Sequence, residues 1–150
     1  DGLSGISFGN FLIKNVAHKL KQEVENLEQF VTLSPVPGFV NWLEKKSINQ
    51  NIDDETLLTQ ALIYLTKSER NDNLPNDPVA KFHLGNGAIL EKINLKADLS
   101  DKGISQSRGI MVNYLYNLDL LEKNHELFFK TQNVQQSDEI LSLKKKLQIH

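Results

Sequence analysis

Two prolines separated by one valine, Pro35 and Pro37, constrain the fold of this chain more than any other short feature. Residues 29–33, which contain the short apolar run Phe30-Val31, predict a strand. Pro35 ends this strand because proline has no backbone N–H to donate, and it holds the preceding Ser34 in extended backbone. The sequence therefore predicts a serine at a strand end, where its hydroxyl can face a pocket. Alternatively, Ser34 bonds only nearby backbone, and no G-x-S-x-G nucleophile elbow surrounds it.

His83 is the second side chain in an informative setting, because it directly precedes a flexible run that ends in Gly85, Asn86 and Gly87. Such a run lets the backbone adopt positive φ and come close to a ligand. An imidazole can give or take a proton near neutral pH, so His83 is a candidate proton donor. The alternative is a buried histidine that bonds only backbone. The other histidines show no metal-ligand spacing: His18, His125 and His150.

Glycines recur at the start of the chain, in residues 2–9, directly before an apolar pattern of helical spacing. We expect residues 4–10 to form a loop that leads into a helix from near Gly9 to about Leu27. The first N–H groups of a helix are unpaired and lie at the positive end of its dipole, so they can bind a phosphate. The alternative is a flexible entry to the helix. The expected apolar side comprises Phe11, Leu12, Val16, Leu20, Val24 and Leu27.

Tyr114 and Tyr116 alternate in a predicted strand at residues 110–116, so both face the same side of a sheet. Tyrosines in this position commonly pack in the core with the hydroxyl at its rim. One of them could instead orient a ligand or the histidine.

The remaining pattern predicts one α+β domain. Expected helices lie at 38–46, from Asp53 or Asp54 to about residue 65, at 77–83, at 100–107 and at 137–147, the last with Ile140, Leu141 and Leu143 inward. Residues 127–131 are a weak strand candidate, residues 88–95 are ambiguous, and residues 68–75 form a polar surface loop.

Composition excludes several classes of protein. The chain has no cysteine, so disulfides and thiolate zinc sites are impossible. Its net charge is −2 and it has no basic stripe, which argues against nucleic-acid binding. No apolar run is long enough for a membrane helix, so we expect no membrane partner. We see no metalloprotease, phosphate-loop or paired-carboxylate pattern and expect no metal.

Four segments together resemble the malonyl-CoA decarboxylase family. They are GLSGISFGNFLIK at residues 2–14, TLSPVPGF at 32–39, DPVAKFHLGNGA at 77–88 and GIMVNYLY at 109–116. The resemblance implies a fold like that of the GNAT acyltransferases, with a mixed sheet flanked by helices. It covers most of the chain and identifies it with the C-terminal part of the catalytic domain. The family's helical domain and the first strands of the sheet have no counterpart in residues 1–150.

The resemblance also implies an activity, the decarboxylation of malonyl-CoA to acetyl-CoA and CO₂. It implies Ser34 and His83 as the catalytic pair, with the serine on the malonyl group, the histidine as proton donor and Tyr116 orienting the pair or the substrate. No cofactor is implied, since coenzyme A is part of the substrate. The implied pyrophosphate cradle comprises Ser4, Gly5, Ile6, Ser7, Phe8, Gly9 and Asn10.

Two other functions fit the same resemblance: an acyl-CoA transferase, which would need an acceptor site, and a non-catalytic fragment. We expect the isolated 150 residues to be inactive, and the full-length protein to be a homo-oligomer. The chain ends in Gln148, Ile149 and His150 instead of the peroxisomal tripeptide Ser-Lys-Leu. We therefore expect a cytoplasmic protein, or a mitochondrial one in a eukaryotic cell.

Overall fold

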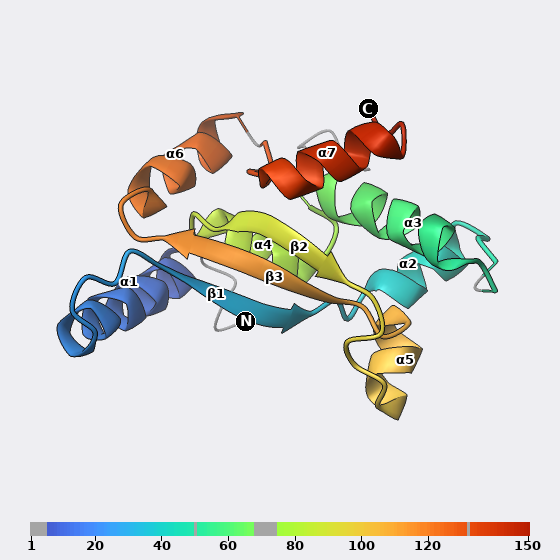
Figure 1. The fold of residues 1–150 in the computed structure, drawn as a ribbon, viewed down its shortest axis with the longest axis horizontal. Helices are drawn as coiled ribbons and strands as arrows, with labels where there is room; N and C mark the ends of the chain where they lie inside the picture. The colour runs from blue at the N-terminus through green and yellow to red at the C-terminus, as the bar shows by residue number, and fades with distance from the viewer. Residues whose placement is uncertain (1–5, 50, 68–74, 132) are drawn as a thin grey trace.

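A computed structural model describes residues 6–49, 51–67, 75–131 and 133–150, with the backbone alone for residues 6–12. This described part of the chain contains seven helices and three strands (Figure 1). In chain order they are α1 (Ile6–Glu23), β1 (Gln29–Pro35), α2 (Phe39–Lys45), α3 (Asp54–Thr66), α4 (Pro78–Gly85), β2 (Ile89–Asn94), α5 (Asp101–Ser107), β3 (Met111–Asn117), α6 (Leu121–Thr131) and α7 (Asp138–Lys146). The predicted α+β class is confirmed, and the ambiguous residues 88–95 contain strand β2.

The three strands form a sheet in the order β1-β3-β2, with β3 antiparallel to both neighbours. The expected mixed sheet needs one correction. Among the described residues, parallel pairing is limited to an isolated bridge between Leu90 and Gln136, beside β2. Strand β2 also shifts register between Leu90 and Lys92, which bulges Glu91 out of the ladder.

Cross-strand pairing between β1 and β3 determines which side chains share a face. Thr32 lies opposite Tyr114, Ser34 opposite Val112 and Phe30 opposite Tyr116. Side chains of directly opposite residues point to the same side of a sheet. Both tyrosines are fully buried. The prediction that they share a face is confirmed, and they share it with Ser34.

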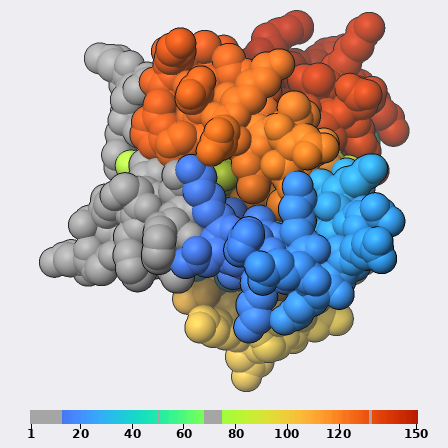
Figure 2. All heavy atoms as spheres, turned by 90° about the vertical axis from the view of Figure 1, so that its left-hand side faces the viewer, coloured from blue at the N-terminus to red at the C-terminus, as the bar shows by residue number. Residues whose placement is uncertain are grey.

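The helices lie on the faces and ends of this sheet. In Figure 1, α4 lies behind the sheet, α7 runs beside β2, and α2, α3 and α5 gather at the end where β1 terminates. Helix α1 packs against α4, and α4 also contacts α6. Figure 2 shows α1 side chains against α6, where Lys14 reaches Glu122 at 3.5 Å across an exposed surface.

Helix α1 differs from the expectation at both ends. It begins at Ile6, so residues 6–10 are helical instead of looped, and it ends at Glu23 instead of near Leu27. Gly9 therefore lies inside a helix, which glycine disfavours without preventing. The expected apolar side was also partly wrong. Val16 and Val24 are exposed, whereas Ala17 joins the buried core among the side chains described from Ile13 onward. The side chains of Phe11 and Leu12 lie outside the described ones.

Helix α6 replaces the weak strand expected at residues 127–131. Its buried side chains are Leu121, Asn124 and Phe128, which follow the three- to four-residue period of a helix. The adjacent Phe128 and Phe129 also suit a strand, and the helical period is evident only when Leu121 and Asn124 are included. In α7, Ile140 is buried as expected, but Leu141 is half exposed and points outward.

Capping side chains start α3, α4, α5 and α7 where the sequence predicted. Asp53, Asp77, Ser100 and Ser137 each accept a hydrogen bond from a backbone N–H in the first turn of the following helix. None of the helices in the described ranges is long and apolar enough to cross a membrane.

Candidate active site

Ser34 and His83 meet although they are 49 positions apart in the sequence. The Oγ of Ser34 lies 3.1 Å from Nε2 of His83, and both side chains are buried. Strand β1 presents the serine at the position before Pro35, and α4 presents the histidine in its last turn. The two side chains that the resemblance pairs are therefore in hydrogen-bond contact.

Tyr116 occupies the other nitrogen of the imidazole. Its hydroxyl lies 2.5 Å from Nδ1 of His83, and its ring stacks on Phe30 at a centroid distance of 4.8 Å. Tyr114 stacks on the flat face of His83 at 4.5 Å. Between these contacts the imidazole is held on both nitrogens and on one face, so its orientation is fixed before any ligand arrives.

Burial determines the charge of this cluster. It lowers the pKa of His83 to about 4, so the imidazole is neutral at pH 7. It raises the pKa of Tyr116 above its usual value, so the phenol keeps its hydrogen. A neutral imidazole has one N–H and one bare nitrogen, and each must face the matching partner.

The hydrogen bond with Tyr116 determines which nitrogen of His83 carries the hydrogen. Tyr116 is fully buried, and its hydroxyl bonds Nδ1 of His83 and no other group in the described part of the chain. If Nδ1 donated to the tyrosine, the phenolic hydrogen would be buried without an acceptor, at a cost of about 1–3 kcal/mol. Tyr116 therefore donates to Nδ1, and Nε2–H of His83 donates to Ser34. Ser34 keeps its own hydrogen for another acceptor.

Thr32 is a member of this cluster that the sequence reasoning missed. Its Oγ1 lies 3.1 Å from Oγ of Ser34, two residues along the same face of β1. In the absence of a ligand it can accept the Ser34 hydrogen. The two-residue period of a strand could have indicated it, since residues 32 and 34 necessarily face the same side.

The loop after His83 is tied to α6 rather than left open. Nδ1 of His125 donates to the carbonyl of Gly85 at 2.6 Å, and Nδ2 of Asn124 donates to the carbonyl of Gly87 at 3.2 Å. Gly87 has a φ of +90°, as expected, but the backbone it approaches is the carbonyl of Leu121. His125, which the sequence reasoning set aside, is thus a structural support of this loop.

The predicted pyrophosphate cradle is described only in part. Ser4 and Gly5 lie outside the described residues, and Ile6, Ser7, Phe8, Gly9 and Asn10 form the first turns of α1. The backbone N–H groups at this helix start have no partner within the helix. The backbone N–H groups that the predicted cradle requires therefore belong to the first turns of a helix and not to a loop.

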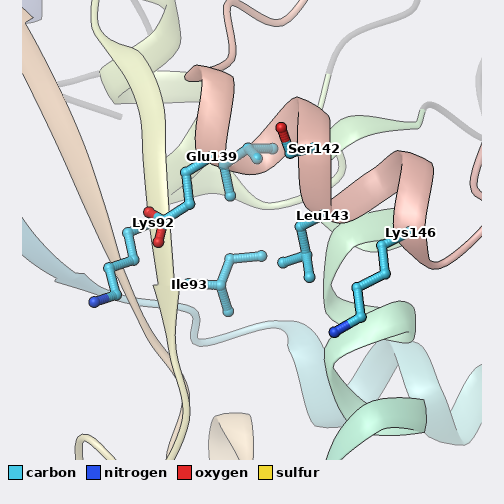
Figure 3. Close-up of a pocket in the computed structure, with 7 residues that line it drawn as sticks. Lys92, Ile93, Glu139, Ser142, Leu143 and Lys146 are labelled. Carbon is cyan, nitrogen blue, oxygen red and sulfur yellow. The ribbon is translucent and has the colours of Figure 1, made fainter.

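Three hollows in the described surface do not contain the Ser34–His83 pair. One, of about 280 Å³, lies between β2 and α7, where Ile93 and Leu143 point toward each other and Lys92 and Lys146 lie at opposite sides (Figure 3). A second, of about 480 Å³, begins at Pro35, next to the serine, and extends to α5. The third, of about 510 Å³, lies between α2 and Tyr64. No group of three His, Asp or Glu side chains in the described ranges could hold a metal ion.

Comparisons with known proteins agree on one family. The model of the malonyl-CoA decarboxylase C-terminal domain matches residues 1–61 and 45–149. The mitochondrial malonyl-CoA decarboxylases of Mus musculus and Rattus norvegicus are 33% and 34% identical, over 95% of this chain. The chain spans only 38% of the length of either relative. Their aligned stretch of 187 residues exceeds this chain's 150, so the relatives carry extra residues within the matched region.

Solved structures give the same result. The crystal structure of malonyl-CoA decarboxylase from Rhodopseudomonas palustris superposes with a TM-score of 0.82 at 39% identity, covering 95% of this chain and 39% of that one. The enzyme from Agrobacterium vitis gives a TM-score of 0.78 at 40% identity, covering 96% and 42%. The arrangement of α1, the sheet and α4 is thus shared with experimentally determined structures.

Proposed function

This chain belongs to the malonyl-CoA decarboxylase family, and from that premise we propose that it is part of an enzyme that converts malonyl-CoA to acetyl-CoA and CO₂. The observation that carries the proposal is the buried chain of hydrogen bonds from Tyr116 through His83 to Ser34. A fixed imidazole beside a serine hydroxyl suits a reaction that makes and then protonates a carbanion.

The reaction needs three things from the protein. Loss of CO₂ leaves an electron pair that the thioester carbonyl takes up as an enolate, so the protein must bind coenzyme A, stabilise the enolate oxygen and protonate carbon. We propose no cofactor, because the thioester of the substrate itself accepts the electron pair. The N-terminus of α1 supports the first task, since the N–H groups of a first helical turn have no partner within the helix and suit a pyrophosphate.

Ser34 and His83 divide the other two tasks. Because Nε2–H of His83 donates to Ser34, the serine hydrogen is free to turn from Thr32 to an oxygen of the malonyl group. Once substrate binding has protonated His83, the imidazolium gives its Nε2 proton to the carbanion, directly or through the serine hydroxyl. This leaves a neutral imidazole, which takes a new proton from solvent for the next turnover. The carboxylate of bound malonyl-CoA would raise the pKa of His83, because a nearby negative charge favours the imidazolium.

Replacement of the histidine tests this assignment in the whole protein in which these residues occur. We expect His83→Asn to lower acetyl-CoA formation about 10²–10⁴-fold, the typical contribution of a positioned acid, while coenzyme A still binds. His18→Asn is the matched control, because His18 is exposed on α1 and bonds only Gln22 among the described residues. Turnover of His83→Asn close to wild type would remove the histidine from the reaction.

The same assay separates the two other functions. An acyl-CoA transferase would form an acylated product only when an amine acceptor is added, and no acceptor site is evident among the described residues. A non-catalytic fragment would leave malonyl-CoA unchanged with and without the amine. Acetyl-CoA formed without an acceptor supports the decarboxylase.

Two broader proposals concern the oligomeric state and the location of the whole protein. We propose that the whole protein is a homo-oligomer, which light scattering after gel filtration would test. We propose a cytoplasmic location, or a mitochondrial one in a eukaryotic cell. The Mus musculus and Rattus norvegicus relatives are named as mitochondrial.

A further inference from the structure

Asp77 is a buried carboxylate for which the proposed reaction has no use. It is completely inaccessible to solvent. Its Oδ2 accepts hydrogen bonds from the N–H groups of Val79 and Ala80, both at 3.0 Å, and its Oδ1 accepts from the hydroxyl of Tyr64 at 3.1 Å. The backbone amide of Gly38 also donates to it. Because all four recorded partners are neutral donors, the group is held as an acceptor only, which is the ionised form.

These partners come from the segments that hold the two candidate catalytic side chains. Val79 and Ala80 open α4, whose last turn carries His83. Gly38 directly precedes α2 and ends the turn that follows β1, the strand that carries Ser34. The carboxylate therefore joins the segment that positions the serine to the helix that positions the histidine.

The close approach of this turn to the Tyr64–Asp77 pair requires glycine at position 38. A Cβ added to Gly38 would lie 2.5 Å from the hydroxyl of Tyr64 and 3.8 Å from Oδ1 of Asp77. Tyr64 is itself almost fully buried and cannot move away easily. Hence the turn lies directly on the Tyr64–Asp77 pair, and its distance from α4 is set by that pair.

We propose that Asp77 is a positioning residue that sets the contact between Ser34 and His83 by fastening the turn after the serine to the start of α4. It acts through the backbone and not through its charge on the imidazole. The shift in the pKa of His83 comes from burial, whereas the charge of Asp77 acts on Tyr64 and Tyr114. The consequence for catalysis rests on the proposed function, but the consequence for the geometry of the pair does not.

Asp77→Asn separates this role from helix capping. Asparagine is as good an N-cap as aspartate, so its oxygen can still accept from Val79 and Ala80. Its NH₂ group then takes the place of Oδ1, the atom that accepts from Tyr64 and lies beside Gly38, and an NH₂ group cannot accept there. Tyr64→Phe is a milder second variant, which removes one donor and keeps the ring.

Asp53→Asn is the matched control. Asp53 caps α3 through the N–H of Thr56 at 2.8 Å and lies on the surface, away from the Ser34–His83 pair. The whole protein is labelled with ¹⁵N-histidine, and the imidazole resonances of His83 are assigned by their loss in His83→Asn. We expect a single tautomer protonated on Nε2 in wild type and in Asp53→Asn. In Asp77→Asn we expect mixed tautomers and a pKa of His83 raised by about one unit as water enters.

Kinetics with malonyl-CoA complete the test. A misplacement of about 1 Å can cost up to about 10²-fold in rate, so we expect kcat to fall about 10–100-fold in Asp77→Asn with little change in KM. Tyr64→Phe should show a smaller loss in the same direction. An unchanged His83 spectrum in both variants would overturn the proposal, whatever their turnover. A changed spectrum in a protein that never turns over malonyl-CoA would support the positioning role and count against the proposed function instead.

Discussion

At the scale of single residues, the neutral state of buried His83 makes stability depend on pH. Burial lowers its pKa from 6.5 to about 4 in the folded state, so between these values the unfolded chain binds a proton that the folded chain does not. The free energy of unfolding should therefore fall as pH decreases from about 6.5 to about 4, by about 3 kcal/mol from this group. Urea unfolding at a series of pH values measures the slope.

His83→Gln should flatten that slope, whereas His18→Gln should leave it unchanged because His18 is exposed. Asp77 acts with the opposite sign, since burial raises its pKa and its protonation stabilises the folded state as pH falls. Both variants retain Asp77, so the difference between them isolates the histidine. Equal slopes in wild type and His83→Gln would show that the imidazole is accessible to water.

The sequence predicted the main members of the site but not their bonding. Ser34, His83 and Tyr116 stood out through proline, glycine and strand alternation, and through the resemblance of four segments to one family. The link from Tyr64 to Asp77 had no such signal, because it joins a helix interior to a helix cap across the core. Such a contact follows from how α3 packs and not from any local pattern.

At the scale of elements, α6 is expected to hold the loop that follows His83. Asn124→Ala removes the bond to the carbonyl of Gly87 and leaves that buried carbonyl without this donor. We expect a loss of about 1–3 kcal/mol in the free energy of unfolding, measured by chemical denaturation. Lys123→Ala, at the exposed neighbouring position of the same helix, is the control and should stay within about 0.5 kcal/mol of wild type. Equal effects of the two substitutions would mean that α6 does not support the loop.

Local signals predicted elements well where a cap or a proline marked a boundary, as at Asp53, Asp77, Ser100 and Ser137. Local signals predicted the wrong element where the period of a helix is evident only over a longer stretch of sequence. Phe128 lies in a short apolar cluster that fits a strand, and only the preceding turn of the helix reveals its period. The sequence predicts too late a start for α1 because glycine is common in loops, whereas the helix continues through Gly9.

At the scale of the whole molecule, one side of strand β1 exposes apolar side chains. Val31 and Leu33 point to the side of β1 opposite the buried Ser34, and they are 51% and 57% exposed. Strand β1 is also the edge of the three-stranded sheet. Exposed apolar side chains on an edge strand favour association with another segment. Since the chain spans 38% of its mouse relative, the remaining length of a family member could supply that cover.

We therefore predict that residues 1–150 alone turn over no malonyl-CoA and associate through β1. Replacing Val31 and Leu33 together by threonine should lower self-association in light scattering, because it removes the apolar surface and keeps residues that suit a strand. The melting temperature should change little, since both side chains are already half exposed. A purified full-length family member serves as the reference for turnover. A monomeric, cooperatively melting chain with turnover like that reference would show that the 150 residues already contain the complete catalytic unit.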